Sequence, residues 1–324
     1  MSPTLIDIAR ETSTSVSTVS RVLAGGAVAQ RISEQTRGRV LEAASRLGYR
    51  PNLLARSLRT RKTHAVALLV SDIANPFFSQ IASLVEQSLH KHGYSLVLCN
   101  SGEDPDREDE YLNLLPRKGI DALILVPMAR GRKAVTASLP KNLPLVVLDR
   151  PIPGIAACVS SDQEQAAAAL SDALARAGVR KIALICGPQV IFTHRRRTEI
   201  ISHRFEIVAK FEGTAQVESG RAAGAKLNGS PPDAVVCTNN LLGQGYLESL
   251  ARSEMLPIVG IFDDVPMMRL LPVPIVCCVQ DIPRLAEACV RQLLAQLQEP
   301  SREPEPILLP TRVVTNSAFD ALAS

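Results

Sequence analysis

The residues that could do chemistry in this chain fall in two places, and the first is a hydroxyl-rich segment near the N-terminus. Val16, Val19 and Val22 recur there at helical spacing. They leave four polar side chains on an exposed face, which are Ser17, Thr18, Ser20 and Arg21. Short hydroxyl side chains can bond to bases or phosphates, and an arginine can make a bidentate contact with guanine. The pattern favours a helix that reads DNA, although an ordinary solvated helix would carry the same residues.

The second place is a series of side chains that follow short aliphatic runs in the rest of the chain. Six runs have such followers: Asp72, Asn75, Phe77 and Phe78; Asp149 and Arg150; Arg195, Arg196 and Arg197; Asn239 and Asn240; Asp263 and Asp264; Gln280. A single Asp after a strand is usually a helix cap or a turn former. Polar residues after six runs predict a cleft for a polar ligand, because ligands bind at the carboxyl ends of parallel strands.

Three predicted helices would position the first group. Thr4 fits a capping box at the start of a helix over residues 5–12. Ser15 can cap a second helix over residues 16–23, and a third helix should span residues 34–47. The third helix is expected to turn four apolar side chains inward, which are Val40, Leu41, Ala44 and Leu47. Two short helices joined by a tight turn and supported by a third describe a helix-turn-helix domain.

Alternating strands and helices would position the second group. The aliphatic runs lie at 65–70, 95–99, 122–126, 145–148, 181–186, 234–237, 257–261 and 275–279. Amphipathic stretches such as 78–92 and 163–177 lie between them. This alternation predicts parallel sheets built from βαβ units. The number of runs suits two doubly wound α/β subdomains with a ligand cleft between them.

The basic residues are concentrated in the first fifth of the chain. Residues 1–62 hold 11 Lys and Arg and four Asp and Glu, whereas residues 63–324 hold 25 and 28. A compact segment of net charge +7 beside a body of −3 is the pattern expected of phosphate contact. A charged, solvated chain end would give the same count, but the helical order within the segment favours DNA binding.

The composition restricts the remaining possibilities. The chain has 324 residues, 46% hydrophobic and 3% aromatic, which predicts about two folded domains with aliphatic cores. Its start lacks the apolar region of a signal peptide, and no window is apolar enough for a transmembrane helix, so we expect a cytoplasmic protein. The seven cysteines form no CxxC pair. We therefore expect reduced, buried thiols, no metal site and no cofactor.

Four motifs near the N-terminus resemble the lac repressor family of bacterial transcription regulators. They are residues 4–9 (TLIDIA), 15–23 (SVSTVSRVL), 48–52 (GYRPN) and 55–60 (ARSLRT). The resemblance implies that Val16, Ser17 and Arg21 read the major groove of an operator. It also implies that Asn52 starts a hinge helix and that Leu58 wedges into the minor groove, where an apolar wedge bends DNA. The predicted DNA-contacting set is completed by Thr4, Ser15, Thr18, Ser20, Ala55 and Arg56.

The resemblance extends over nearly the whole chain, through residues 72–78 (DIANPFF), 148–150 (LDR), 262–264 (FDD) and 279–281 (VQD). It implies a two-lobed α/β effector domain like that of periplasmic binding proteins. It implies seven effector contacts, which are Phe77, Phe78, Asp149, Arg197, Asn239, Asp263 and Gln280. We add Asp72, which follows the first strand, to this predicted set. Arg197 would pair with a carboxylate, a phosphate or sugar hydroxyls.

Within the family, residues 103–106, 241–245 and 269–280 look most similar to the fructose catabolite repressor branch. That branch senses anionic sugar derivatives. The chain departs from the family pattern at Ile200, where a glycine is common, at Ala215, where an aromatic often stands, and at Asn240, where Asp is common. The effector therefore stays open between a sugar, a sugar phosphate and a sugar acid.

The prediction as a whole is a homodimeric, sequence-specific transcription regulator that represses carbohydrate metabolism genes. We expect a headpiece over residues 1–49, a hinge over 50–62 and an effector domain over 63–324. Its two subdomains should comprise residues 63–160 with 281–310, and 161–280 with 311–324. An exported sugar receptor would need a signal peptide, and a kinase or dehydrogenase would be expected to show GxxxxGK[ST] or GxGxxG after the first strand. The sequence contains neither of these two nucleotide-binding motifs, and its start does not resemble a signal peptide.

Overall fold

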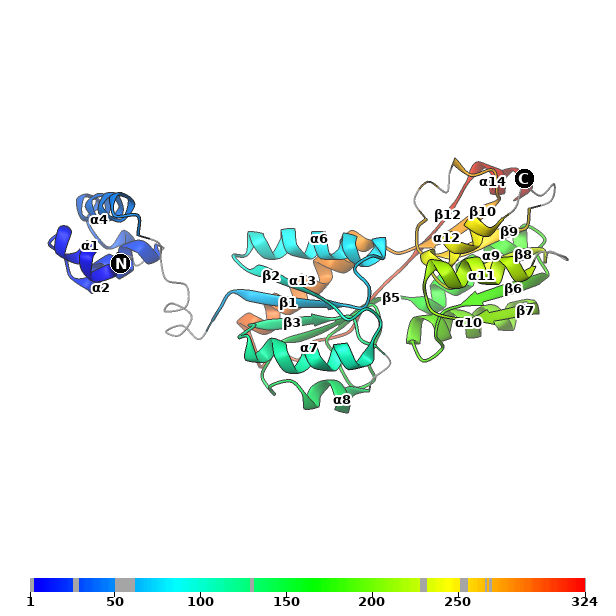
Figure 1. The fold of residues 1–324 in the computed structure, drawn as a ribbon, viewed down its shortest axis with the longest axis horizontal. Helices are drawn as coiled ribbons and strands as arrows, with labels where there is room; N and C mark the ends of the chain where they lie inside the picture. The colour runs from blue at the N-terminus through cyan, green and yellow to red at the C-terminus, as the bar shows by residue number, and fades with distance from the viewer. Residues whose placement is uncertain are drawn as a thin grey trace. The chain divides into compact units, whose positions relative to one another are not determined.

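The computed structural model describes residues 3–25, 29–49, 62–128, 131–227, 232–250, 256–265, 267 and 270–323. The chain separates into two compact units, Met1–Thr63 and His64–Ser324, which are drawn in Figure 1. Each unit is described below by itself. Among the described residues, none of the helices combines the length and the apolar character that crossing a lipid bilayer requires.

The first unit is a small helical domain. Its helices are α1 (Leu5–Glu11), α2 (Val16–Ala24) and α4 (Glu34–Arg46). They pack on a shared core that is centred on Ile8, Val19 and Val40. At the end of α2, Gly25 adopts a φ of 68°, which a glycine accepts without strain.

One side chain of α4 lies where we did not expect it. Leu41 was predicted to face the core, but it is 53% exposed, so this prediction is wrong. Val40, Ala43 and Ala44 occupy the buried face of the helix. Leu41 follows Val40 by one residue, which turns its side chain about 100° around the helix and away from the core.

The second unit contains two six-stranded sheets, which we call lobe 1 and lobe 2 together with their helices. The sheet of lobe 1 has the order β11 (Ile307–Leu309), β5 (Cys158–Ser161), β4 (Leu145–Leu148), β3 (Ala122–Leu125), β1 (Ala65–Val70) and β2 (Ser95–Asn100). The sheet of lobe 2 has the order β12 (Arg312–Thr315), β10 (Ile275–Val279), β9 (Ile258–Phe262), β8 (Ala234–Cys237), β6 (Lys181–Cys186) and β7 (Glu206–Glu212). The paired strands are parallel, except that β12 runs antiparallel to β10.

Helices cover both faces of each sheet, so both sheets are doubly wound. In lobe 1, α6 (Pro76–Lys91) and α13 (Ile282–Gln298) pack on one face, and α7 (Pro105–Arg117) and α8 (Arg132–Ala137) pack on the other (Figure 1). In lobe 2, α9 (Gln163–Arg176), α10 (Phe192–Arg204) and α14 (Ser317–Ala323) cover one face. The other face carries α11 (Val217–Leu227) and α12 (Asn240–Ser249). The central strands are buried on both faces, which explains their continuous aliphatic sequences.

The chain passes between the lobes at three points, after β5, after β10 and after β11. The two sheets have the same strand order, and β4 in lobe 1 and β9 in lobe 2 are each the third strand of their sheet. The carboxyl ends of these two strands therefore occupy equivalent positions. The predicted fold class of a helical headpiece with a two-lobed α/β domain is confirmed. All eight predicted runs form strands, within one residue at either end.

Four strands were not predicted: β5, β7, β11 and β12. β7 lies at the edge of its sheet, and exposed and half-buried residues alternate along it. Because three of its exposed residues are charged (Glu206, Lys210 and Glu212), its sequence does not form a continuous aliphatic run. β11 and β12 have only three and four residues and owe their structure to the strands beside them.

Candidate functional site

The first candidate site is the outer face of α2. Ser15 caps this helix by accepting a hydrogen bond from the Thr18 amide at 3.1 Å. Its hydroxyl also lies 2.8 Å from the hydroxyls of Ser17 and Thr18, so three hydroxyls cluster at the helix start. Val16, Ser17 and Arg21 are exposed, whereas Thr18 and Ser20 are half-buried. An exposed helical face that combines a methyl-bearing residue, hydroxyls and a guanidinium is suited to the edges of DNA bases.

Five predicted DNA contacts lie outside α2 and its cap, and Thr4 is the one among them that the structure describes. Thr4 forms a complete capping box with Asp7, whose carboxylate accepts bonds from the Thr4 amide at 2.9 Å and hydroxyl at 2.7 Å. Thr4 therefore fixes the start of α1 and remains exposed. The predicted hinge residues Asn52, Ala55, Arg56 and Leu58 lie outside the described residues.

The second candidate site is built where β4 and β9 end. Asp149 follows β4 with a φ of 66°, and Asp263 follows β9 with a φ of 70°. A left-handed backbone is unusual for a residue with a side chain, and it ends each strand abruptly. Both aspartates are at least nine-tenths buried.

On lobe 1, the acidic group after β4 is joined by an arginine. The Arg150 guanidinium lies 3.8 Å from the Asp149 carboxylate and 3.4 Å from that of Glu103. It also donates to the carbonyl of Pro127 at 3.3 Å and lies 5.8 Å from the centre of the Phe78 ring. Phe77 and Phe78 are buried in the first turn of α6 and contact each other edge to face, so they line this side with apolar surface.

On lobe 2, Arg197 is the hub of a buried network. Its Nε donates to Gln163 Oε1 at 2.7 Å, and its Nη1 donates to the Thr238 carbonyl at 2.8 Å and lies 3.4 Å from Asp263 Oδ2. The guanidinium lies 4.6 Å from the centre of the Phe262 ring. Gln280 donates to Asp263 Oδ1 at 2.6 Å. These contacts hold the arginine and the carboxylate rigidly on the lobe 2 wall.

Several buried polar atoms at this site have no hydrogen-bond partner among the described residues. They are Ser71 Oγ, Asp149 Oδ1, Arg150 Nε, Ser161 Oγ and Gln280 Oε1. Leaving a buried donor or acceptor unpaired costs about 1–3 kcal/mol, so such groups are usually satisfied by a ligand or water. Both donors and acceptors are present, which matches the hydroxyl groups of a carbohydrate.

Burial also sets the charge of the groups in the site. Burial raises the pKa of the Asp149 carboxyl, and the guanidiniums of Arg150 and Arg197 oppose this effect. Burial likewise raises the pKa of Glu103, again opposed by Arg150. The pKa of His194, which lies on α10 beside the network, is well below its usual value because of burial and the two guanidiniums.

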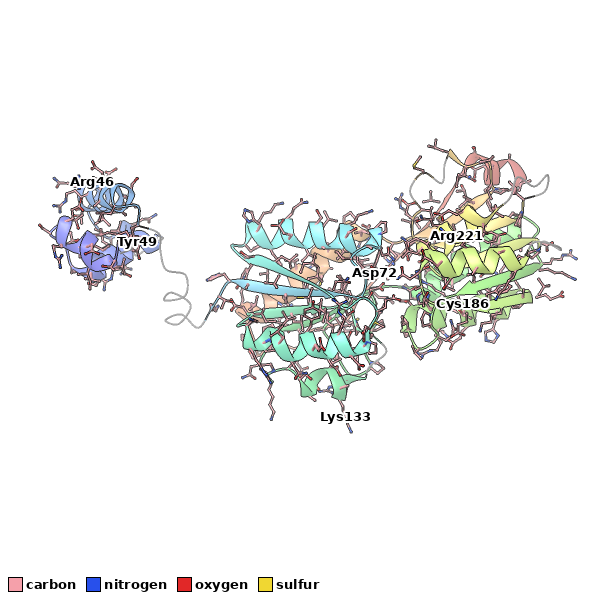
Figure 2. The ribbon with its side chains drawn as sticks, viewed as in Figure 1. Arg46, Tyr49, Asp72, Lys133, Cys186 and Arg221 are labelled. Atoms are coloured by element: carbon pink, nitrogen blue, oxygen red, sulfur yellow. The ribbon has the colours of Figure 1, made fainter. Side chains whose placement is uncertain are left out.

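Hydrogen bonds join the two lobes beside this site. Asn75 and Asn240 exchange two bonds between their side-chain amides, at 3.2 and 3.0 Å. Gln216 donates to Asp72 at 3.0 Å, and Asp72 lies at the end of lobe 1 nearest to lobe 2 (Figure 2). Asp72 is thus engaged by the opposite lobe.

Asn239 is the predicted effector contact that the structure places in a different setting. Its Oδ1 accepts from the Leu242 amide at 2.9 Å, which caps α12, and its Nδ2 donates to the Ala215 carbonyl at 3.0 Å. Both ends of the side chain are thus occupied within lobe 2. The structure brings the other seven predicted residues to the facing edges of the lobes.

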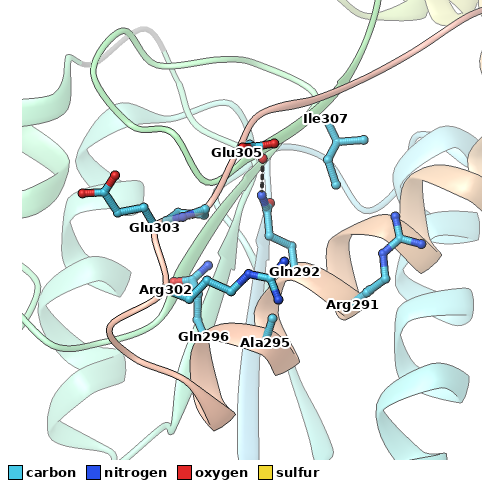
Figure 3. Close-up of a pocket in the computed structure, with 9 residues that line it drawn as sticks. Arg291, Gln292, Ala295, Gln296, Arg302, Glu303, Glu305 and Ile307 are labelled. Carbon is cyan, nitrogen blue, oxygen red and sulfur yellow. Dashed lines mark hydrogen bonds between the residues drawn. The ribbon is translucent and has the colours of Figure 1, made fainter.

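Two pockets lie between the lobes. The first, about 170 Å³, has a mixed polar and apolar wall, which includes Phe77, Asn240, Asp263, Asp264, Gln280 and Arg312. The second, about 350 Å³, has two arginines, Arg150 and Arg195, and no acidic residue in its wall. A further pocket of about 350 Å³ on lobe 1, between α13 and residues 302–307, contains none of the predicted site residues (Figure 3). No group of three potential metal ligands occurs among the described residues.

Sequence reasoning missed four residues that build the site: Glu103, Gln163, His194 and Thr238. Thr238 and Glu103 each follow a strand closely, so the rule that found Asp149 could have found them. His194 precedes Arg197 by three residues, the spacing of one helical face. No sequence pattern pointed to Gln163, because it takes part in the site only by accepting a hydrogen bond from Arg197, which lies far away in the sequence.

The fold and the two sites define a class of protein in which a small helix-turn-helix domain precedes a two-lobed ligand-binding domain. Comparison with known proteins agrees with this class. Residues 4–52 match the model described as "Bacterial regulatory proteins, lacI family". Residues 63–263 match "Periplasmic binding proteins and sugar binding domain of LacI family". The chain therefore belongs to the lacI family of bacterial regulatory proteins.

Individual relatives support the same assignment. The ribose operon repressor of Halalkalibacterium halodurans is 29% identical over 96% of this chain and 95% of its own. The lac repressor dimer bound to operator and the anti-inducer ONPF has a TM-score of 0.84 at 22% identity, over 98% of this chain and all of that one. The Cra regulator of Pseudomonas putida, in complex with fructose 1-phosphate, has a TM-score of 0.73 at 23% identity, over 78% of this chain and 98% of that one. These relatives are transcriptional regulators and not enzymes.

Proposed function

We propose that this protein is a cytoplasmic, homodimeric repressor of carbohydrate metabolism genes whose operator binding is controlled by a small carbohydrate effector between the two lobes. The observation that carries the proposal is the set of buried polar atoms without hydrogen-bond partners on Asp149, Arg150 and Gln280, together with those on Ser71 and Ser161. In a lacI-family chain, this set is the natural place for a ligand that supplies several hydroxyl groups. The effector contacts of the proposal are Asp72, Phe77, Phe78, Asp149, Arg197, Asn239, Asp263 and Gln280.

The shape and charge of the two interlobe pockets suggest how the ligand would be oriented. Carboxylate and amide groups such as Asp263 and Gln280 line the smaller pocket, where they can accept from and donate to sugar hydroxyls. Arg150 and Arg195 stand in the wall of the larger pocket, where a phosphate or carboxylate could pair with them. Arg150 already faces the carboxylates of Asp149 and Glu103, and Arg195 faces that of Glu199, so the ligand would share these cations with protein carboxylates. We therefore favour a sugar phosphate or sugar acid over a neutral sugar. The structure of the Cra regulator with fructose 1-phosphate is consistent with this class, as is the resemblance to the fructose catabolite repressor branch.

The headpiece, residues 1–49, would read the operator through the outer face of α2, and residues 50–62 would form the hinge. Residues 63–324 would sense the effector, through subdomains at 63–160 with 281–310 and at 161–280 with 311–324. A homodimer follows from the two half-sites of a symmetric operator. The lac repressor structure is itself a dimer on its operator.

The proposal can be tested with the full-length protein in two measurements. A duplex selected from a random library would give the operator, and fluorescence anisotropy would give its Kd. A thermal-shift panel of ribose, gluconate, glucose 6-phosphate and fructose 1-phosphate would then identify a ligand. We expect at least one anionic member to raise the Tm and to change the operator Kd at least tenfold, in either direction. A protein that selects no duplex, or whose duplex affinity is unaffected by every ligand that binds, would contradict the proposal.

A further inference from the structure

His194 is a buried residue of lobe 2 beside the Arg197 network. It lies in the first turn of α10, three residues before Arg197 on the buried face of the helix, and is 3% exposed. The ring lies directly against Gly187, just after β6, where an added Cβ would stand 2.6 Å from its Cε1 and Nε2 atoms. Glycine at this position therefore makes the room that the ring occupies.

The hydrogen bonds of Thr238 favour one tautomer of the His194 ring. The Thr238 hydroxyl oxygen accepts from the Gly187 amide at 3.0 Å and lies 2.8 Å from His194 Nδ1. A hydroxyl has one proton to donate, and among the described residues Nδ1 is the acceptor within its reach. With Nδ1 as the acceptor of this bond, the single proton of the neutral ring resides on Nε2.

The surroundings of His194 keep this ring neutral and leave its donor available. Burial and the guanidiniums of Arg197, on the same helix, and Arg150, on the opposite lobe, hold the pKa of His194 well below its usual value. Across the described part of the chain, no residue accepts a hydrogen bond from Nε2. The site therefore presents a neutral N–H donor alongside two cationic ones.

We propose that His194 is a specificity-determining residue of the effector site, which donates its Nε2–H to an oxygen of the ligand held by Arg150 and Arg197. This inference rests on the proposed function of the cleft. A neutral donor of fixed direction selects for an oxygen at one position of the ligand, such as a hydroxyl, carboxylate or phosphate oxygen. An analogue without that oxygen would leave the donor unpaired and would bind more weakly.

The first test reads the tautomer of the ring by NMR of the full-length protein labelled with ¹⁵N-histidine. The His194 signals are identified by their absence in His194→Gln. We expect the Nε2–H form in wild type, loss of this preference in Thr238→Val and its recovery in Thr238→Ser. A ring protonated on Nδ1 in the wild-type protein would overturn the inference.

The second test measures ligand affinity by calorimetry with whichever member of the sugar panel binds most tightly. We expect His194→Ala to raise the Kd at least tenfold and His194→Gln, which retains an N–H donor, to recover part of the loss. His203→Ala is the matched control, because His203 is an exposed histidine of the same helix. An unchanged Kd in His194→Ala would overturn the role of His194 alone. Failure of the wild-type protein to bind any panel member would instead count against the proposed function, and against the inference with it.

Discussion

The side-chain amides of Asn75 and Asn240 exchange two hydrogen bonds between the lobes, at 3.2 and 3.0 Å. Asn75 is also the cap of α6, since its Oδ1 accepts from the Phe77 amide at 3.0 Å. Asn240 begins α12 on the other lobe. The helix that carries the aromatic wall of the site is thus tied to the opposite lobe by a buried amide pair.

Replacing Asn240 by Asp should weaken this tie. A carboxylate retains the acceptor for Asn75 Nδ2, but it loses the donor to Asn75 Oδ1 and places a negative charge against that oxygen. Asn75 Oδ1 keeps the bond from the Phe77 amide, so the lost hydrogen bond itself costs about 0.5–1.5 kcal/mol, to which the repulsion between the two oxygens adds. We expect Asn240→Asp to lower the free energy of unfolding in urea by at least this amount.

The control is Asn142→Asp, which adds the same charge at an exposed position of lobe 1. It should leave the urea midpoint nearly unchanged. Equal unfolding curves for the two variants would show that the hydrogen bonds between Asn75 and Asn240 contribute nothing to the free energy of unfolding.

Much of the site was predictable because its residues follow buried strands. Aliphatic runs that are buried on both faces are visible in sequence, and the residue after each run must lie at the carboxyl edge of the sheet. Asp149, Asp263 and Gln280 were found in this way. The strand order was not needed, since in each parallel sheet these ends meet at one edge.

The rest depended on information that a local pattern does not carry. Asn239 follows a strand as Asp263 does, and the fold shows in addition that its side chain caps α12. The value of Gln163 and Thr238 lies in their bonds to Arg197 and His194, over 34 and 44 residues of sequence. Leu41 shows what an apolar pattern cannot decide in a helix. It is exposed although the neighbouring Val40 is fully buried, because one step along the helix turns the side chain from the core to the solvent.

Removing the guanidinium of Arg197 should abolish the effector response and leave operator binding intact. In Arg197→Ala, Asp263 loses its buried cationic partner and the ligand loses its anchor on lobe 2. Breaking a buried ion pair costs about 3–5 kcal/mol, so the Tm of the second unit should also fall. The headpiece is a separate unit, and the operator Kd measured by anisotropy should therefore stay within a few-fold of wild type.

Arg196→Ala provides the comparison for this variant. Arg196 is the next residue along α10, and it pairs with Glu164 and Glu199 at the surface. Its removal should leave the effector response unchanged. If Arg197→Ala still responded to ligand as Arg196→Ala does, Arg197 would not be the anchor.

Changing Arg21 to Ala should relax base preference at one position of each operator half-site. Arg21 is exposed in the last turn of α2, and a bidentate arginine contact discriminates between bases by about 1–3 kcal/mol. Arg39→Ala, on the exposed surface of α4, removes the same charge and should weaken all duplexes alike. Affinities measured over all single-base variants of the operator separate the two effects. Uniform weakening by Arg21→Ala would assign this residue to the phosphates.

The buried imidazole of His194 should make the protein less stable in mild acid. The folded-state pKa of His194 is well below 6.5, whereas an unfolded chain titrates near that ordinary value. As the pH falls from 6.5 toward the lowered value, the unfolded chain binds the extra proton, so unfolding becomes easier by up to about 1 kcal/mol per pH unit. Above pH 7 the group makes no such contribution. The raised pKa values of Asp149 and Glu103 act in the opposite direction at lower pH, because there the folded chain takes up protons first.

Comparing His194→Gln with the wild-type protein isolates the histidine from these carboxyl groups, which both proteins share. Urea unfolding at pH 7.5, 6.5 and 5.5 should give a difference between the two proteins that changes by less than about 0.5 kcal/mol between the upper two values and shifts in favour of His194→Gln by about 1 kcal/mol more at pH 5.5. His203→Gln is the matched control, because it makes the same substitution at an exposed position of the same helix. A difference between wild type and His194→Gln that does not change with pH would mean that the imidazole takes up its proton without unfolding the lobe. In that case the two guanidiniums would not hold the ring neutral.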